Sequence, residues 1–191
     1  MKVLGISGGL RRDSHNMKLL RTAGEMFEAA GAEFEIYPDL KLVPPYDEDD
    51  DTDPAPAAVA HLRAAVAAAD AVFFATPEYN SSVPGQLKNA VDWLSRPSGA
   101  NVLLNKPVAV VGASTGMFGA VWAQAELRKA LAASGARVLD GEVAVGHAHT
   151  RFEPDGSLND PNLAEQLDDV VRIVVGEIDR ARGERVPASV T

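Results

Sequence analysis

Short apolar runs alternate with longer amphipathic stretches along the whole chain. The runs, rich in Val, Ile and Phe, occupy residues 3–6, 34–37, 71–75, 108–111 and, more weakly, 138–145. The third and fourth runs contain no polar residue, which is typical of strands that are buried on both faces of a parallel sheet. The pattern therefore predicts five strands.

Between these runs, apolar residues recur every three or four positions, as they do along one face of a helix. This spacing predicts helices over residues 17–30, 54–69, 87–94, 118–133 and 163–182. Gly31 fits the end of the first helix, and Asp53 followed by Pro54 fits a cap and a first-turn proline for the second.

Strands that alternate with helices form βαβ units, and right-handed crossovers turn such units into a doubly wound parallel sheet. Five strands favour a flavodoxin-like three-layer α/β sandwich with the strand order 2-1-3-4-5 over a six-stranded dinucleotide fold. We expect a single domain over residues 1–182, followed by a C-terminal tail at 183–191.

Composition narrows the classes of function. The formal net charge of -9 disfavours nucleic acid and anionic membranes as partners. The chain has no cysteine, which excludes disulfides, thiolate nucleophiles and iron–sulfur clusters. No stretch approaches the roughly 18 apolar residues of a membrane span, and we expect a cytoplasmic protein.

Two polar features raise the question of a metal site. The acidic run at residues 47–53 lacks the glycine turn and the spaced glutamate of a calcium loop, and we interpret it as a solvated loop. His147 and His149 are two residues apart, but no third ligand accompanies them. We predict no metal ligand.

Ligands of such sheets bind beyond the carboxyl ends of the strands, where the strand order reverses. The loop at residues 7–16 leads there from a strand into a helix, and it carries two glycines, two arginines and two further hydroxyl or amide groups near the helix start. Free amides at a helix N-terminus and arginine side chains both bind phosphate. The loop lacks the third glycine of a dinucleotide motif and the Lys of a Walker loop, so it fits a single phosphate. The alternative is an ordinary loop in which Ser14 caps the helix.

Two more loops reach the same end of the sheet. Residues 76–85 contain two prolines that stiffen the backbone around Tyr79, whose ring could face a flat heterocycle or be buried in a rigid turn. Residues 112–119 are small and polar, and in the alternative interpretation Ser114 or Thr115 caps a helix. A phosphate at one end and a flat polar ring at the other describe a mononucleotide such as FMN.

The sequences of these loops resemble one known family. Residues 8–16 are similar to the phosphate loop of the NADPH-dependent FMN reductases, a group that includes quinone, chromate and azo-dye reductases. The segment Thr76-Pro77-Glu78-Tyr79-Asn80, followed by residues 83–93, is close to the family signature, and the resemblance extends over residues 3–139.

The resemblance implies that FMN is bound and that NADPH or NADH is the co-substrate. It implies contacts to the phosphate from Arg11, Ser14, Asn16 and backbone amides near Gly9 and Leu10, with Arg12 and His15 beside them. The implied cofactor-binding residues are Gly9, Leu10, Arg11, Arg12, Ser14, His15, Asn16, Pro77, Glu78, Tyr79, Asn80, Ser114, Thr115 and Gly116. We expect no general acid or base, because the flavin carries the redox chemistry.

The chain departs from the family pattern at Gly9, where the family usually has Ser, so one hydroxyl donor to the phosphate is missing and retention of FMN is in question. We expect His15 to face solvent. Lys88 is a further candidate for contact with the phosphates of the nicotinamide cofactor.

The family also implies a homodimer or homotetramer in which the helix at residues 87–93 lies at the interface, and the alternative for Trp93 is the core. The alternative function is that of a flavodoxin-like FMN electron carrier that does not oxidise NAD(P)H, and a third is a non-catalytic nucleotide sensor. The sequence leaves open whether the acceptor is a quinone, chromate, an azo compound or free flavin.

Overall fold

The apolar runs of the chain form the strands of one sheet in a computed structural model that describes residues 1–184. The strands are β1 (Lys2–Ser7), β2 (Glu33–Ile36), β3 (Ala71–Thr76), β4 (Pro107–Ala113), β5 (Arg137–Val138) and β6 (Ala144–Val145). They are arranged in the order β2-β1-β3-β4-β5, and β6 also pairs with β4. All strand pairs are parallel, so the predicted doubly wound α/β fold with the order 2-1-3-4-5 is confirmed.

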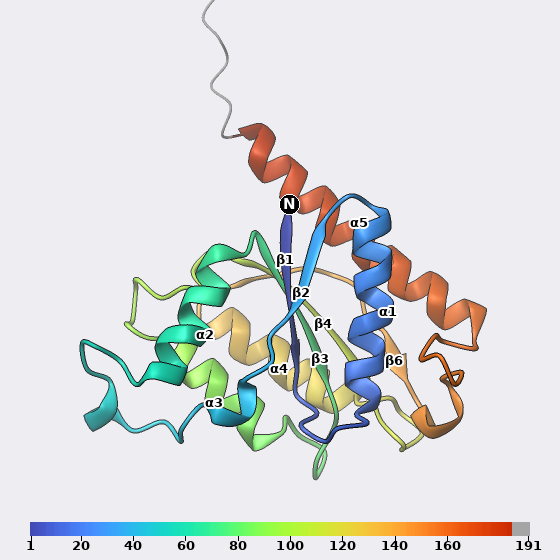
Figure 1. Cartoon of the computed structure of the whole chain (residues 1–191), viewed down its shortest axis with the longest axis horizontal. Helices are drawn as coiled ribbons and strands as arrows, with labels where there is room; N and C mark the ends of the chain where they lie inside the picture. The colour runs from blue at the N-terminus through green and yellow to red at the C-terminus, as the bar shows by residue number, and fades with distance from the viewer. Residues whose placement is uncertain (185–191) are drawn as a thin grey trace, which may run out of the picture.

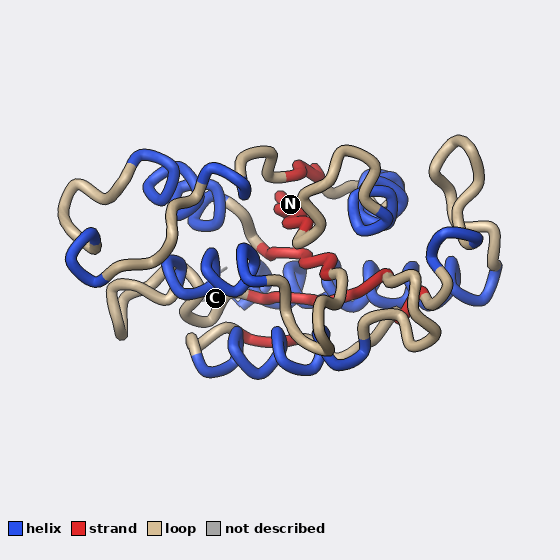
Figure 2. Tube along the Cα trace, turned by 90° about the horizontal axis from the view of Figure 1, so that it is seen from below, coloured by secondary structure: helices blue, strands red, loops and turns tan. Residues whose placement is uncertain are grey.

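Helices cover both faces of this sheet, as Figures 1 and 2 show. They are α1 (His15–Ala29), α2 (Ala57–Ala68), α3 (Gly85–Leu94), α4 (Val121–Ala133) and α5 (Pro161–Glu184), with short 3-10 helices η1 (Leu40–Leu42), η2 (Glu48–Asp50) and η3 (Ala148–Thr150). Helices α1 and α5 pack on one face, and α2, α3 and α4 pack on the other. This three-layer arrangement buries β3 and β4 completely, as their unbroken apolar runs predict.

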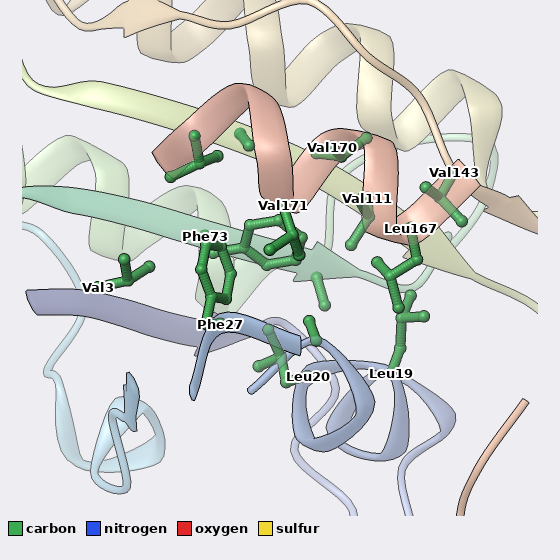
Figure 3. Packing of buried hydrophobic residues seen from close by; sticks show 14 of the residues in the cluster. Val3, Leu19, Leu20, Phe27, Phe73, Val111, Val143, Leu167, Val170 and Val171 are labelled. Carbon is green, nitrogen blue, oxygen red and sulfur yellow. The ribbon is translucent and has the colours of Figure 1, made fainter. Parts of the chain in front are cut away.

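The layer between α1, α5 and the sheet contains a closely packed aromatic contact. The ring of Phe73 from β3 meets the ring of Phe27 from α1 edge to face, with 5.4 Å between centroids. Figure 3 shows Val171 of α5 beside this pair. This contact joins one strand to both helices on its face, so it fixes how α1, whose N-terminus borders the candidate site, lies on the sheet.

The last predicted strand, residues 138–145, is wrong as a single element. It is divided into β5 and β6, which pair with the two ends of β4. The Leu139 N–H still donates to the Val108 carbonyl and the Gly112 N–H to the Val143 carbonyl, so the pairing with β4 is interrupted over residues 140–142. The guanidinium of Arg128 on α4 fills the gap: it donates hydrogen bonds to the carbonyl oxygens of Val110 (2.7 Å), Leu139 (2.9 Å) and Gly141. Burial lowers the pKa of Arg128, and the side chain replaces the missing strand pairing at this edge.

Two helices begin later than the sequence pattern indicates. Helix α2 starts at Ala57 instead of residue 54, because a residue that precedes a proline avoids the helical conformation and Pro56 follows Ala55. Helix α4 starts at Val121 instead of residue 118, since Gly119 and Ala120 both have positive φ. Neither helix begins with a hydrogen bond from its own N-cap side chain.

The apolar side chains of helix α3 are buried in the core. Leu87 and Trp93 are each 0% exposed, and the indole N–H of Trp93 donates to the carbonyl of Pro44 at 2.9 Å. Trp93 is therefore a core residue, which was the alternative to a place at a subunit interface. The side chains that α3 leaves exposed are polar, and Lys88 pairs with Asp92 at 2.6 Å.

The acidic run at residues 47–53 is mostly exposed, contains η2, and is joined to α2 where Asp51 pairs with Arg63 at 3.0 Å. Helix α5 continues to Glu184, two residues past the predicted end of the domain, and the rest of the predicted tail, 185–191, lies outside the described residues. Among residues 1–184, no helix is long and apolar enough to cross a membrane, and no three His, Asp or Glu side chains are grouped so that they could hold a metal ion. The cytoplasmic location stays a prediction.

Replacing Arg128 with Met tests its role at the sheet edge. We expect the free energy of unfolding to fall by about 2–3 kcal/mol, because three carbonyls lose a charged donor. Urea titration of Arg128→Met and of the control Lys129→Met, which alters an exposed neighbour on the same helix, measures the difference. Equal midpoints for the two variants would contradict this role.

Candidate functional site

The loops after β1, β3 and β4 meet at the carboxyl ends of these strands. In Figure 1 the loops after β1 and β3 lie side by side below the sheet, and the Gly8 N–H donates to the Ala75 carbonyl at 2.8 Å. They enclose a cavity of ≈ 270 Å³. Its lining consists of Gly9, Arg11, Ser14, His15, Asn16, Pro77, Glu78, Tyr79, Ala113, Ser114 and Thr115. All of these except Ala113 are predicted site residues.

The loop after β1 presents a row of unpaired amides to this end of the sheet. The N–H groups of residues 10–16 donate no hydrogen bond within the part of the chain that the structure describes. They lead into the N-terminus of α1, where the helix dipole favours negative charge. The Ser14 hydroxyl also lines the cavity, is 3% exposed, and makes no hydrogen bond to residues 1–184. These donors and Arg11 match the demands of a phosphate group.

Gly9 leaves room for that hydroxyl. A Cβ atom placed on Gly9 would stand 2.1 Å from Ser14 Oγ, so a side chain at residue 9 would force Ser14 to turn away. The Gly9 N–H itself lies 3.2 Å from the Ser7 hydroxyl. Gly9 supplies no side-chain hydroxyl, and the Ser14 hydroxyl lies against the space that a side chain at residue 9 would occupy.

The side chain of Asn16, predicted to contact the phosphate, forms hydrogen bonds with the backbone of Ala113. Its amide nitrogen donates to the Ala113 carbonyl and its amide oxygen accepts from the Ala113 N–H, both at 2.9 Å. The side chain is 2% exposed and therefore joins the start of α1 to the end of β4. Asn16 borders the cavity, but its side chain is committed to Ala113, and its backbone N–H is the group left for an anion.

His15 does not face solvent as expected. Its ring is half-buried and stacks on Phe152, with 5.9 Å between ring centroids, and its Nδ1 is buried without a hydrogen bond in the described part of the chain. Burial lowers the pKa of His15, and the nearby positive charges of Arg11 and Lys18 lower it further. Since the neutral imidazole is favoured, the positive charge at this wall of the cavity comes from Arg11.

The loop after β3 folds into a tight turn. Tyr79 and Ser82 exchange two backbone hydrogen bonds of 3.1 Å, and the residues between them, Asn80 and Ser81, have φ of 53° and 59°. This pair of left-handed residues is characteristic of a type I′ turn. The predicted turn is present, and the stiffness of its backbone stays a prediction. The Tyr79 ring is 54% exposed beside the cavity, so the alternative of a buried Tyr is wrong.

Glu78 secures this turn to the neighbouring helix. One oxygen of its carboxylate accepts hydrogen bonds from the N–H groups of Trp122 and Ala123, at 3.1 and 3.2 Å. The Ser82 hydroxyl donates to Glu126 on the same helix. Glu78 therefore serves as the N-terminal cap that α4 lacks from its own chain, and this contact sets the distance between the second and third loops.

The third loop is supported by β6 and the segment that follows it. The Ser114 N–H donates to Val145, and the N–H groups of His147 and Ala148 donate to Gly116 and Ser114. A Cβ on Gly146 would stand 2.1 Å from the Met117 carbonyl, so glycine is required for this close approach. Ser114 and Thr115 are not helix caps. Sequence reasoning missed this support, for which Gly146 was the available signal.

Four predicted site residues lie off the cavity lining. Asn80 is at the tip of the turn after β3, and Gly116 is one residue past the lining of the third loop. Leu10 and Arg12 border a second cavity, on the side of the phosphate loop that faces β2. Ala113 and Phe152 contribute to the site through their contacts with Asn16 and His15, which no sequence signal indicated.

Comparison with known proteins agrees with this geometry. A model of the NADPH-dependent FMN reductase family matches residues 1–150. An NAD(P)H-dependent FMN reductase of Pseudomonas aeruginosa is 39% identical over 184 residues, which are 96% of this chain and 98% of that protein. A quinone reductase of Pseudomonas putida is 37% identical over 161 residues, covering 81% of this chain and 83% of that protein.

A solved structure has the same architecture. FerB, a flavoenzyme NAD(P)H:(acceptor) oxidoreductase from Paracoccus denitrificans, superposes with a TM-score of 0.81 and 35% identity over 94% of this chain and 97% of its own. With a family model that spans most of the sequence and relatives that cover nearly all of it, the chain belongs to the NADPH-dependent FMN reductase family.

Proposed function

We propose that this chain is an FMN-dependent oxidoreductase that passes electrons from NAD(P)H to quinones or similar small acceptors. The observation that carries the proposal is the cavity at the carboxyl ends of β1, β3 and β4, with unpaired amides and Arg11 at one end and the Tyr79 turn at the other. The family membership and the quinone reductase among the relatives support the same reaction.

The residues of the phosphate loop would hold the FMN phosphate. The amides of residues 10–16, the Ser14 hydroxyl and the Arg11 guanidinium provide neutral and charged donors around one anion. Because these donors have no competing partner in residues 1–184, no protein hydrogen bond has to break when the phosphate enters. Gly9 leaves the Ser14 hydroxyl in place beside these donors, because a side chain at residue 9 would displace it.

The two other loops would orient the ring. Pro77 and Tyr79 form one wall, Ser114 and Thr115 form the other, and the contact of Glu78 with α4 keeps the walls apart. Bound FMN would supply the hydride and electron-transfer chemistry between NAD(P)H and the acceptor. Polar backbone groups of these loops would stabilise negative charge that develops on the pyrimidine side of the ring. The half-exposed Tyr79 leaves an entrance for donor and acceptor in turn.

The proposal includes a homo-oligomer. The apolar side chains of α3 are buried in the core, so they do not support a subunit interface on this helix. Exposed apolar side chains lie instead beside the third loop: Met117, Phe118 and Trp122 are 63%, 52% and 47% exposed. The rings of Phe118 and Trp122 touch edge to face. A second copy placed on these residues would bury them and lie next to the third loop.

Mixing the FMN-loaded protein with NADPH in a stopped-flow instrument tests the reaction. We expect the visible flavin absorbance to disappear within seconds of mixing and to return when a benzoquinone is added, because a ring bound beside the half-exposed Tyr79 would be open to both reactants. An FMN-loaded protein that stays yellow in excess NADPH and NADH would favour the electron-carrier alternative.

Arg11→Ala tests the phosphate end of the cavity. Loss of one charge-assisted hydrogen bond should raise the Kd for FMN about 10- to 100-fold, which corresponds to about 1.5–3 kcal/mol. Titration of the apoprotein with FMN, followed by flavin fluorescence, measures this constant. Lys129→Ala removes an exposed charge elsewhere and serves as the control. An FMN Kd that is the same in both variants would exclude Arg11 from the site.

Asn16→Ala distinguishes positioning from direct contact. Because Asn16 joins α1 to β4, we expect its removal to lower the stability of the FMN-free protein by about 1–3 kcal/mol, whereas Arg11→Ala should leave that stability within about 0.5 kcal/mol of the parent. Urea unfolding of both apoproteins gives the comparison. Unchanged apoprotein stability in Asn16→Ala, combined with weak FMN binding, would restore the predicted direct contact.

A further inference from the structure

Unpaired positive side chains gather beside the phosphate loop although the chain is strongly acidic. Within residues 1–184, the Lys and Arg side chains that form no ion pair, hydrogen bond or ring contact are Arg11, Arg12, Arg21, Lys41 and Lys129. The first four line one cavity of ≈ 250 Å³. Four like charges so close together repel one another, so their gathering suggests an anion that the cavity receives.

Three elements build this second cavity. The phosphate loop contributes Arg11 and Arg12, α1 contributes Arg21 one turn after Met17, and the segment from the end of β2 into η1 contributes Lys41. The cavity lies at the carboxyl ends of β1 and β2, across the phosphate loop from the FMN cavity. Arg11 and Gly9 line both cavities, so the two sites share one wall.

The two carboxylates near this cavity, Asp13 and Asp39, each lie within ion-pair distance of a side chain outside it. Asp13 pairs with Lys18 at 3.2 Å, and the Asp39 carboxylate lies 3.7 Å from His61. No acidic residue lines the second cavity. The remainder of its lining includes the apolar residues Met17, Pro38, Leu40 and Tyr37. Apolar side chains of this kind suit a base, and guanidinium and ammonium groups suit a phosphate.

We propose that this cavity binds the 2′-phosphate and the adjoining adenosine of NADPH. The proposal rests on the proposed function, in which NADPH lies over the flavin ring and its far end has to be held outside the FMN cavity. Arg21 on α1 and Lys41 in η1 lie at the flank of the sheet beyond the phosphate loop, where they would meet the far end of a dinucleotide whose nicotinamide end enters the FMN cavity.

The structure favours this cavity over Lys88, the candidate from the sequence. Lys88 is paired with Asp92 at 2.6 Å on α3, away from the loops that form the site. A 2′-phosphate carries close to two negative charges at neutral pH and would neutralise part of the repulsion among the four cations. NADH lacks this group, so the second cavity would make the enzyme select NADPH.

The test compares 2′,5′-ADP with ADP, which lacks the 2′-phosphate, by calorimetric titration of the FMN-loaded protein. We expect 2′,5′-ADP to bind at least about 10-fold more tightly, and the double variant Arg21→Gln/Lys41→Gln to abolish that difference. The control Lys129→Gln removes the one unpaired cation that lies elsewhere in the described chain and should retain the difference. In steady-state assays, the ratio of kcat/KM for NADPH to that for NADH should fall at least about 10-fold in the double variant and stay unchanged in the control.

Three results would overturn the assignment: equal affinities for 2′,5′-ADP and ADP, a double variant that behaves like the control, or inorganic phosphate that binds as tightly as 2′,5′-ADP. Circular dichroism and retained yellow colour verify that the double variant is folded. The titration separates the two proposals, because 2′,5′-ADP binding can be measured even if NADPH fails to reduce the flavin, and flavin reduction can succeed without any preference for 2′,5′-ADP.

Discussion

Two hydrogen bonds between one buried amide and the backbone of Ala113 hold the functional end of this molecule together. Asn16 stands at the start of α1 and Ala113 at the end of β4, 97 positions apart in the sequence. In the sheet, β3 separates β4 from β1, the strand that leads into α1, so the pair joins loops that follow two non-adjacent strands. If Asn16 released Ala113, the phosphate loop and the third loop could move apart, and the cavity between them would lose its shape. A buried amide with both groups satisfied is well suited to this task, because any displacement leaves polar groups without partners.

The same end of the sheet presents donors for anions although the molecule as a whole is negatively charged. With a formal net charge of -9, the molecule as a whole repels phosphate. The loop after β1 counters this repulsion locally, with unpaired amides, a helix N-terminus and two arginines that form no ion pair within the described residues. Elsewhere in the described chain most cations are paired or donate to carbonyls, so positive potential is reserved for the two cavities on either side of the phosphate loop. Local geometry, not net charge, determines which anions this protein accepts.

Irregular segments around the site hold its loops in position. The strand at the edge of the sheet is interrupted, and Arg128 takes over its hydrogen bonds, which allows the segment after β6 to turn toward the third loop and support it. The left-handed residues of the turn after β3 and the carboxylate of Glu78 likewise exchange regular structure for a fixed position of Tyr79. Each departure from regular secondary structure is stabilised by a contact with an element distant in the sequence.

The sequence by itself determined the sheet order, the three loops and the family, because apolar periodicity and local motifs are properties of neighbouring residues. It also identified most of the cavity lining, including Arg11, Ser14, Tyr79 and Ser114. Only the tertiary structure decided that Asn16 bonds to Ala113, that His15 stacks on Phe152, that Trp93 is buried, and that Arg21 and Lys41 join Arg11 and Arg12 around a second cavity. These outcomes depend on which distant side chains meet, and a hydrogen bond, a ring stack or a cluster of charges leaves no periodic signal along the chain.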